Sequence, residues 1–210
     1  LIGQNRLCLL DPGPVDEFQF ENFMIAIGSS ELEAVAVTHT HGDHYPGARR
    51  LADATGAKMI GLAAPMSSGQ DMTFAPSRLY ANREVVDFGE YKLELIYTPG
   101  HVSNHVCYLL RETKILFTGD HILQGTTPVI LPPDGNMLDY LNSLKLLRDQ
   151  PMCYLAPGHG GVMEEPLKEI DSLISHRLRR EAKIFERLRS IGVCDLEKLV
   201  CAAYDDVEAH

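Results

Sequence analysis

The chain has 210 residues, of which 45% are hydrophobic, and its formal net charge is −10. A chain of this length and composition can bury one sizeable hydrophobic core. No apolar run of about 18 residues is present, which excludes a transmembrane helix, and no signal-peptide pattern opens the chain. The acidic balance weighs against a broad surface for nucleic-acid phosphates.

Five cysteines are present, and no two of them form a C-x-x-C pair. An odd number without paired spacing is typical of reduced, mostly buried thiols. We therefore expect a cytoplasmic protein and do not expect cysteine metal ligands.

The N-terminal part of the chain alternates strand and helix patterns. RLCLLDPG (6–13) predicts a buried strand that Pro-Gly ends. Residues 16–27 predict a helix, and AVAVTH (34–39) predicts a second strand. Residues 46–55 predict another helix, followed by a short strand over KMIGL (58–62).

The middle of the chain predicts strands separated by long loops. Residues 64–82 show no clear period, which indicates an irregular loop. KLELIYT (92–98) alternates as a half-buried strand does. HVCYLLR (105–111) and KILFTGD (114–120) predict a strand pair, and residues 122–135 a long loop rich in Thr, Pro and Gly.

The C-terminal part is mainly helical. Residues 137–148 predict an amphipathic helix, and CYLAPGHG (153–160) predicts a last strand and turn. Residues 164–190 then predict one long helix, and residues 196–204 a short one. The alternation of strands and helices along the whole chain indicates the α/β class.

The segment THTHGDH (38–44) carries three histidines and an aspartate directly after a predicted strand. In an extended segment His39 and His41 point the same way, so their imidazoles can share one metal ion. Asp43 and His44 lie past the bend and would face a neighbouring position. The segment therefore predicts ligands for two adjacent metal ions.

Three later strands end in a glycine turn followed by a residue type that binds metals. YTPGH, LFTGD and LAPGH place His101, Asp120 and His159 in this way. Glycine lets the backbone turn without steric cost, and loops at strand ends carry the chemistry of many α/β proteins. A single loop histidine has little meaning, but the ordered set predicts a metal centre suited to Zn²⁺, Mn²⁺ or Fe.

The segments THTHGDH, TPGH (98–101), FTGD (117–120) and APGH (156–159) resemble the metallo-β-lactamase superfamily of metallohydrolases, from about residue 2 to residue 161. This resemblance implies a four-layer αβ/βα sandwich with a dinuclear metal site at one edge. It implies that the first metal ion is held by His39, His41 and His101, the second by Asp43, His44 and His159, and that Asp120 bridges both.

The same resemblance implies the chemistry of the site. Two divalent metal ions, Zn²⁺ with Mn²⁺ or Fe as alternatives, would share a bridging hydroxide as the nucleophile. Asp120 and Asp43 are the candidate catalytic carboxylates, and Asp120 would orient the hydroxide and take its proton. Asp11 would form a hydrogen bond near the ligand loop; the alternative is a turn aspartate before Pro-Gly.

A narrower resemblance is to the β-lactamase-like protein 2 group, on GDHILQGTTPVI (119–130), PPDGNMLDYLNSL (132–144) and HRLRRE (176–181). Characterised members of that group include an endoribonuclease that acts on single-stranded RNA. In that group a small winged-helix-like domain follows the long helix. We therefore expect a catalytic domain over 1–163, without its opening strand, and the truncated start of a second domain over 164–210.

The long helix carries a stripe of cationic residues, which we name the basic stripe: His176, Arg180, Lys183 and Arg187, with Arg177 and Arg179 beside it. The stripe predicts a wall that binds phosphates of RNA or the charged group of a small anionic ester. The alternative is a solvated face with glutamate partners. His176, Arg177, Arg180 and His105 are the candidate substrate-binding residues, whereas His121 is assigned a packing role.

Four functions remain open at this point. A nuclease on single-stranded RNA and a hydrolase of a small thioester or lactone, as in glyoxalase II, use the same metals. An iron-dependent persulfide dioxygenase shares much of the histidine motif. A non-enzymatic scaffold is the fourth, but an inactive relative would typically have lost ligands. We expect no membrane partner, and the oligomeric state is left open.

Overall fold

The computed structural model describes residues 1–206, and the chain divides into two compact units, Leu1–Pro166 and from Leu167 onward. The predicted boundary between residues 163 and 164 lies close to this division. Within the described residues, no helix is both long and apolar enough to cross a lipid bilayer.

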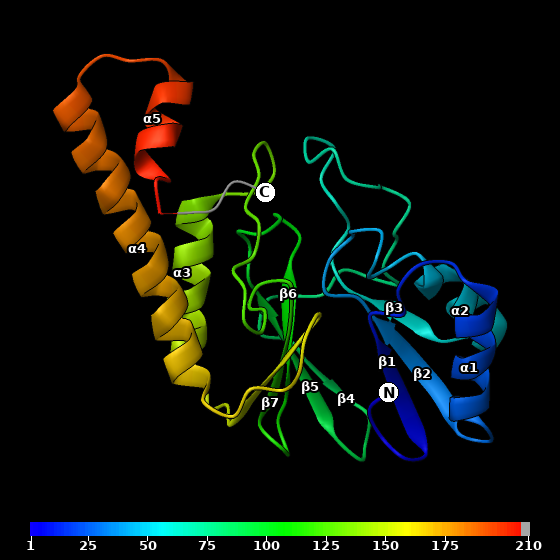
Figure 1. The fold of residues 1–210 in the computed structure, drawn as a ribbon. Coiled ribbons are helices and arrows are strands. Elements are labelled where there is room, and N and C mark those ends of the chain that lie inside the picture. Colours follow the sequence, from blue (N-terminus) through cyan, green and yellow to red (C-terminus); the bar gives the residue numbers. More distant parts are fainter. Residues whose placement is uncertain (207–210) are drawn as a thin grey trace. The chain divides into compact units, whose positions relative to one another are not determined.

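The first unit contains two sheets (Figure 1). The smaller sheet is parallel, in the order β1 (Arg6–Leu10), β2 (Glu31–Ala36) and β3 (Lys58–Ile60). The larger sheet has the order β4 (Val85–Asp87), β5 (Lys92–Tyr97), β6 (Val106–Leu110), β7 (Ile115–Gly119) and β8 (Tyr154–Pro157). Its pairs are antiparallel except β7 with β8, so β5, β7 and β8 all run in the same direction.

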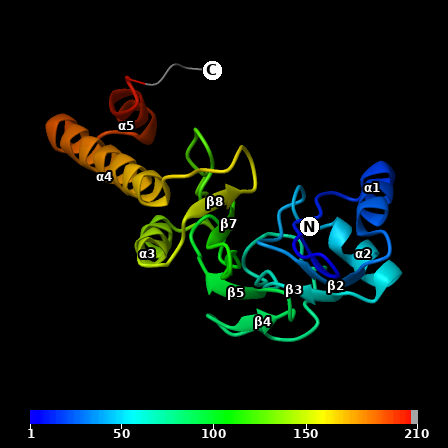
Figure 2. The same cartoon turned by 90° about the horizontal axis from the view of Figure 1, so that it is seen from below.

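Helices lie on the outer faces of the two sheets (Figure 1, Figure 2). The small sheet packs against α1 (Glu17–Ile27) and α2 (Gly47–Thr55), and α3 (Met137–Arg148) lies on the outer side of the large sheet. Alternate β2 residues serve two cores: Ala36 faces the large sheet, whereas Val35 faces α1 and α2. The predicted four-layer sandwich is therefore confirmed.

Local signals explain where the helices begin and end. The Asp16 side chain accepts a hydrogen bond from the Gln19 amide and caps α1, and Asn136 caps α3 in the same way. At the end of α2, Gly56 adopts a left-handed conformation with φ 78°. These capping residues place the observed helices within a residue or two of the predicted ones.

The prediction of a half-buried β5 was wrong. Leu93 and Leu95 face the core between the sheets, but Ile96 on the opposite face is also fully buried. Glu94 is only 8% exposed, because Arg111 donates two hydrogen bonds to its carboxylate and Arg83 lies 3.2 Å from it. Glu94, which the alternating pattern placed on an exposed face, is therefore buried together with its ion-pair partners. The short strand β4 was not predicted at all.

The second unit contains α4 (Pro166–Ile191) and α5 (Leu196–Ala203), which folds back beside α4 (Figure 1). Arg180 of α4 donates to the carbonyl of Ala203 at 2.7 Å, and its guanidinium lies 4.5 Å from the centre of the Tyr204 ring. The winged-helix-like assignment for this part of the chain stays a prediction.

Candidate metal centre

Five strand ends bring the predicted ligands to one edge of the first unit. Asp11 follows β1, and the ligand loop 38–44 follows β2. His101, Asp120 and His159 follow β5, β7 and β8. Because these strands end at the same edge, side chains up to 148 positions apart along the chain, Asp11 and His159, are brought to it.

Three imidazoles form the first cluster. The Nε2 atoms of His39 and His101 lie 2.9 and 3.1 Å from Nδ1 of His41. The Nδ1 atom of His101 lies 2.7 Å from the carbonyl oxygen of Val129, which can only accept a hydrogen bond. Nδ1 of His101 therefore carries the proton, and the lone pair of Nε2 faces the cluster. Three converging ring nitrogens could hold one metal ion.

The second cluster joins His44 to three acidic or imidazole groups. Nε2 of His44 lies 3.3 Å from Oδ1 of Asp120 and 3.7 Å from Oδ2 of Asp43. Nε2 of His159 lies 3.2 Å from the same Asp43 oxygen and 3.7 Å from Oδ1 of Asp120. The group Asp43, His44 and His159, and the group His39, His44 and Asp120, could each hold a metal ion.

Two buried atoms in this cluster fit a bound cation. Within residues 1–206, neither Nε2 of His44 nor Oδ1 of Asp120 makes a hydrogen bond. Burying unpaired polar atoms is costly, and a metal ion between them would satisfy both. The residues present therefore fit the metal ions that the fold implies.

Asp11 organises the ligand loop. Its Oδ1 accepts from the Thr38 amide at 2.7 Å, and its Oδ2 accepts from the Thr38 hydroxyl at 2.7 Å and from Nδ1 of His44 at 3.0 Å. Because Asp11 engages Nδ1 of His44, Nε2 is the ring nitrogen that faces Asp120 and is available to a metal ion.

The electrostatics of the metal-free site favour positive charge at His44. Burial lowers the pKa of His44, but the hydrogen bond with Asp11 and the charges of Asp11 and Asp120 raise it more, to about 10. The pKa of Asp120 is lowered: burial opposes ionisation, and contact with His44 outweighs it. A metal ion would take the place of the proton in this field.

Two glycines, Gly119 and Gly158, keep the metal centre open. The sequence indicated them only as turn residues. A Cβ atom on Gly158 would lie 2.7 Å from Oδ1 of Asp120 and 2.8 Å from Cε1 of His44. Gly119 has φ 47°, and a Cβ there would lie 2.6 Å from the Thr38 hydroxyl oxygen. Any larger residue at Gly158 would therefore push into the metal-binding space.

His105 and His121 lie beneath the ligands and are fully buried. His105 contacts Thr98 through Nδ1 at 2.8 Å, and its ring centre lies 5.3 Å from that of His39. Full burial does not fit the substrate contact considered for His105. Its ring instead packs against the ring of the metal-ligand candidate His39. His121 packs against Tyr140 with ring centres 4.7 Å apart, in line with its predicted packing role.

The basic stripe has partners within the second unit. Arg180 pairs with Asp206 at 2.9 Å, Lys183 with Asp205 and Asp206, and Arg187 with Asp205 at 2.9 Å. For Arg180, Lys183 and Arg187, two aspartates that follow α5 take the place of the expected glutamate partners. The roles of His176, Arg177 and Arg180 in substrate binding stay predictions.

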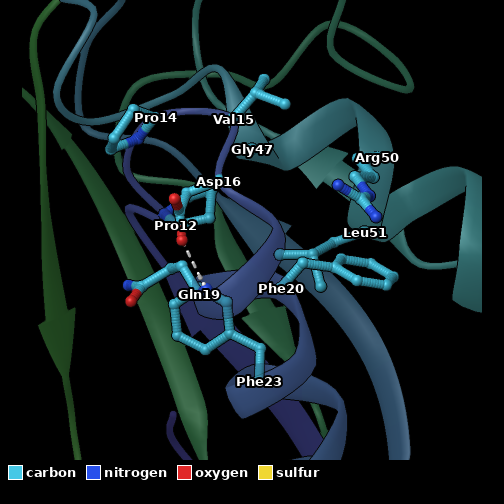
Figure 3. A pocket seen from close by; sticks show the side chains of 10 residues that line it. All are labelled: Pro12, Pro14, Val15, Asp16, Gln19, Phe20, Phe23, Gly47, Arg50 and Leu51. Carbon is cyan, nitrogen blue, oxygen red and sulfur yellow. Dashed lines mark hydrogen bonds between the residues drawn. The ribbon is translucent and has the colours of Figure 1, made fainter.

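A cleft with a volume of about 490 Å³ opens beside His41 and His101, which line it. Its other walls come from the ligand loop, from residues 68–71 and from residues 129–134. A second hollow lies between α1 and α2, where Phe20, Arg50 and Leu51 meet (Figure 3). That hollow has a volume of only about 10 Å³, and the cleft is the better candidate for a substrate because the metal-ligand candidates His41 and His101 line it.

Comparison with known proteins identifies the family. The model for the metallo-beta-lactamase superfamily matches residues 1–159. The chain belongs to this superfamily. The resemblance to this superfamily that the ligand motifs predicted is confirmed.

Two curated relatives match most of this chain. The chain is 31% identical to the beta-lactamase-like protein 2 homolog of Caenorhabditis elegans, over 79% of this chain and 55% of the relative. It is 28% identical to the atrochrysone carboxyl ACP thioesterase of Aspergillus fumigatus, over 90% of this chain and 58% of the relative. The chain thus spans little more than half the length of these two proteins.

A solved structure supports the fold. The crystal structure of a metallo-beta-lactamase family protein from Thermus thermophilus superposes with a TM-score of 0.77 at 19% identity, over 97% of this chain and 81% of that chain. At this identity the likeness concerns the fold alone.

Proposed function

We propose that this chain binds two divalent metal ions and hydrolyses small thioesters or related esters. The observation that carries the proposal is the buried pair formed by Nε2 of His44 and Oδ1 of Asp120, which lack hydrogen bonds within residues 1–206 beside the three-imidazole cluster. Asp120 lies between the two clusters, where one carboxylate could serve both metals.

The side chains of the site have separate roles in this proposal. His39, His41 and His101 would hold one metal ion; Asp43, His44 and His159 would hold the other. When bound, the ions would supply Lewis acidity, which lowers the pKa of a water molecule toward about 7 and stabilises charge developing on a carbonyl oxygen. Asp120 would orient that water and accept its proton, and Asp11 would keep His44 in the tautomer that binds metal.

Three observations favour a thioester over RNA. One relative that matches 90% of the chain is named as a thioesterase. In the second unit, Arg180, Lys183 and Arg187 are already paired with aspartates, which reduces the positive charge available to a phosphate backbone. The chain's net charge of −10 acts in the same direction.

Single-stranded RNA is the second candidate, because the basic stripe presents several cations along one helix. The HRLRRE segment that carries part of this stripe also resembles the β-lactamase-like protein 2 group. In this case the stripe would guide the strand, and the same metal ions would act on a phosphodiester.

The test begins with the metal content of the purified protein, with zinc, manganese and iron measured by elemental analysis. Metal-loaded protein and an Asp120→Ala variant are then assayed side by side on a thioester panel and on end-labelled RNA. Thioester turnover that depends on Asp120 supports the proposal. RNA cleavage alone would replace it with the nuclease, and bound iron with O₂ uptake would replace it with the dioxygenase.

A further inference from the structure

The cleft beside the metal centre has an apolar wall that is open to solvent. Val129 and Leu131 expose 61% and 68% of their surface at this wall. The apolar lining residues include Tyr45, Val102, Val129, Leu131, Pro132 and Pro133. Since Val129 also holds His101 through its carbonyl oxygen, this wall begins at a metal-ligand residue and leads away from it.

The charged groups of the cleft are all of one sign. Asp71 and Asp134 line it, and among its lining residues in the described part of the chain there is no lysine or arginine. The pKa of the Asp71 carboxyl is lowered, first by the Tyr45 hydroxyl and then by the Thr73 amide, so it is ionised at neutral pH. A negatively charged group that occupied the cleft away from the metal centre would therefore meet the carboxylates of Asp71 and Asp134, with no cationic side chain among the lining residues to offset them.

A hydrogen-bond network holds the acidic wall in place. Gln70 donates through Nε2 to Asp134 at 2.6 Å and to Asn104 at 3.2 Å, and its Oε1 accepts from the Thr40 hydroxyl at 2.8 Å. Asp134 also accepts from the Ser103 amide at 3.0 Å. Because Thr40 lies between two metal-ligand histidines, the network connects the wall to the ligand loop.

We propose that this cleft receives an uncharged, apolar group of the substrate and selects against a group that ends in a carboxylate. The inference rests on the proposed thioester hydrolysis and adds the chemical class of the substrate. It differs from the small anionic ester that the basic stripe predicted. The cleft is wide enough for a chain of about six carbons, because ligand pockets of roughly 300–1,000 Å³ hold drug-sized molecules.

A matched pair of thioesters tests the charge preference. Hexanoyl and adipoyl thioesters of N-acetylcysteamine have the same number of acyl carbons and differ by a terminal carboxylate. We expect kcat/KM of the metal-loaded protein to be at least about fivefold higher for the hexanoyl compound, since its terminal methyl is favourably buried and the adipoyl carboxylate is repelled by like charges. A hexanoyl thioester of 3-mercaptopropionate, with the charge on the thiol, shows whether the cleft seats the acyl or the thiol side.

A charge added to the wall should change this preference. In Leu131→Lys a cation enters the cleft, and we expect the ratio of hexanoyl to adipoyl kcat/KM to fall about two- to fivefold, the range of an exposed ion pair. Ile25→Lys is the matched control, because Ile25 is 77% exposed on α1 and does not line the cleft. It adds the same charge and should leave the ratio unchanged.

A binding measurement separates failure of the inference from failure of the proposed function. The hexanoyl and adipoyl amides of N-acetylethylenediamine, in which NH replaces the thioester sulfur, are titrated calorimetrically into Asp120→Ala protein, which needs no turnover. Three results together support the inference, whatever the reaction. The hexanoyl amide binds more tightly than the adipoyl amide, this preference is weaker when Leu131→Lys is combined with Asp120→Ala, and it is unchanged when Ile25→Lys is combined with Asp120→Ala. The inference is overturned if charged and uncharged compounds show equal affinity and equal kcat/KM, with the charge on the acyl side and with the charge on the thiol side. Thioester turnover without that preference would leave the proposed function standing alone.

Discussion

The carboxylate of Asp11 and the imidazole of His44 lie 3.0 Å apart, oxygen Oδ2 to nitrogen Nδ1, although 32 residues separate them in the chain. This contact determines which ring nitrogen of His44 is available to a metal ion. The Asp11→Asn side chain has only one accepting oxygen. In one orientation of the amide an N–H group faces Nδ1 of His44, and in the other the hydrogen bond from the Thr38 amide is lost. We expect metal affinity at the second cluster to fall about 10- to 100-fold, the usual effect of losing such a partner.

Competition with a metal chelator measures this change. The control is Asp53→Asn, which removes an exposed carboxylate paired with Arg49 on α2. Equal metal affinity in Asp11→Asn and in Asp53→Asn would contradict a role for Asp11 in metal binding.

The titration of His44 in the metal-free protein gives a second prediction. Its pKa is raised from the ordinary 6.5 to about 10, so the folded state favours the imidazolium. Its contribution to stability is therefore fully present below about pH 6.5 and is lost as the pH rises through about 10. NMR of labelled histidine rings in chelator-treated protein measures the pKa, which should fall in Asp11→Asn. A normal pKa in the metal-free protein would show that the Asp11 and Asp120 contacts do not form there.

Gly158→Ala should abolish metal binding at the second cluster while the protein stays folded. The added methyl would lie 2.7 Å from Oδ1 of Asp120 and 2.8 Å from the His44 ring. Gly161→Ala is the control in the same loop, because its nearest contact, at 3.2 Å, is the end of the Gln124 side chain, which can move. Elemental analysis with circular dichroism distinguishes the outcomes. Full metal content in Gly158→Ala would mean that the loop can shift away.

The pairing of the basic stripe predicts how RNA would bind if it is a substrate. Hydrogen bonds from Arg180 and Lys183 hold the pKa of Asp206 well below its usual range, so Asp206 neutralises part of the stripe. In the double variant Asp205→Asn, Asp206→Asn the cations lose their partners, and affinity for labelled single-stranded RNA should rise about two- to tenfold at low salt. Fluorescence anisotropy measures it. Unchanged affinity, or affinity that does not depend on salt, would remove the stripe from the RNA path.

The identities of the metal-binding candidates were predictable from local sequence. His39, His101, Asp120 and His159 each follow a strand and a short turn, and both features are encoded within a few residues. Helix ends were predictable for the same reason, since the cap of α1 is formed by Asp16 and the amide three residues later. Interactions over such short distances along the chain leave a pattern in the sequence itself.

The tertiary structure decided what depends on segments far apart. Glu94 is buried because Arg111 lies across the β5–β6 ladder, and β4 forms because β5 offers it an edge. The cleft arises where residues 68–71 meet residues 129–134, joined by Gln70 and Asp134, 64 positions apart. The space that Gly158 leaves for a metal exists only once Asp120 and His44 lie beside it. These properties follow from distances in the folded chain, because no local pattern records which segments will meet.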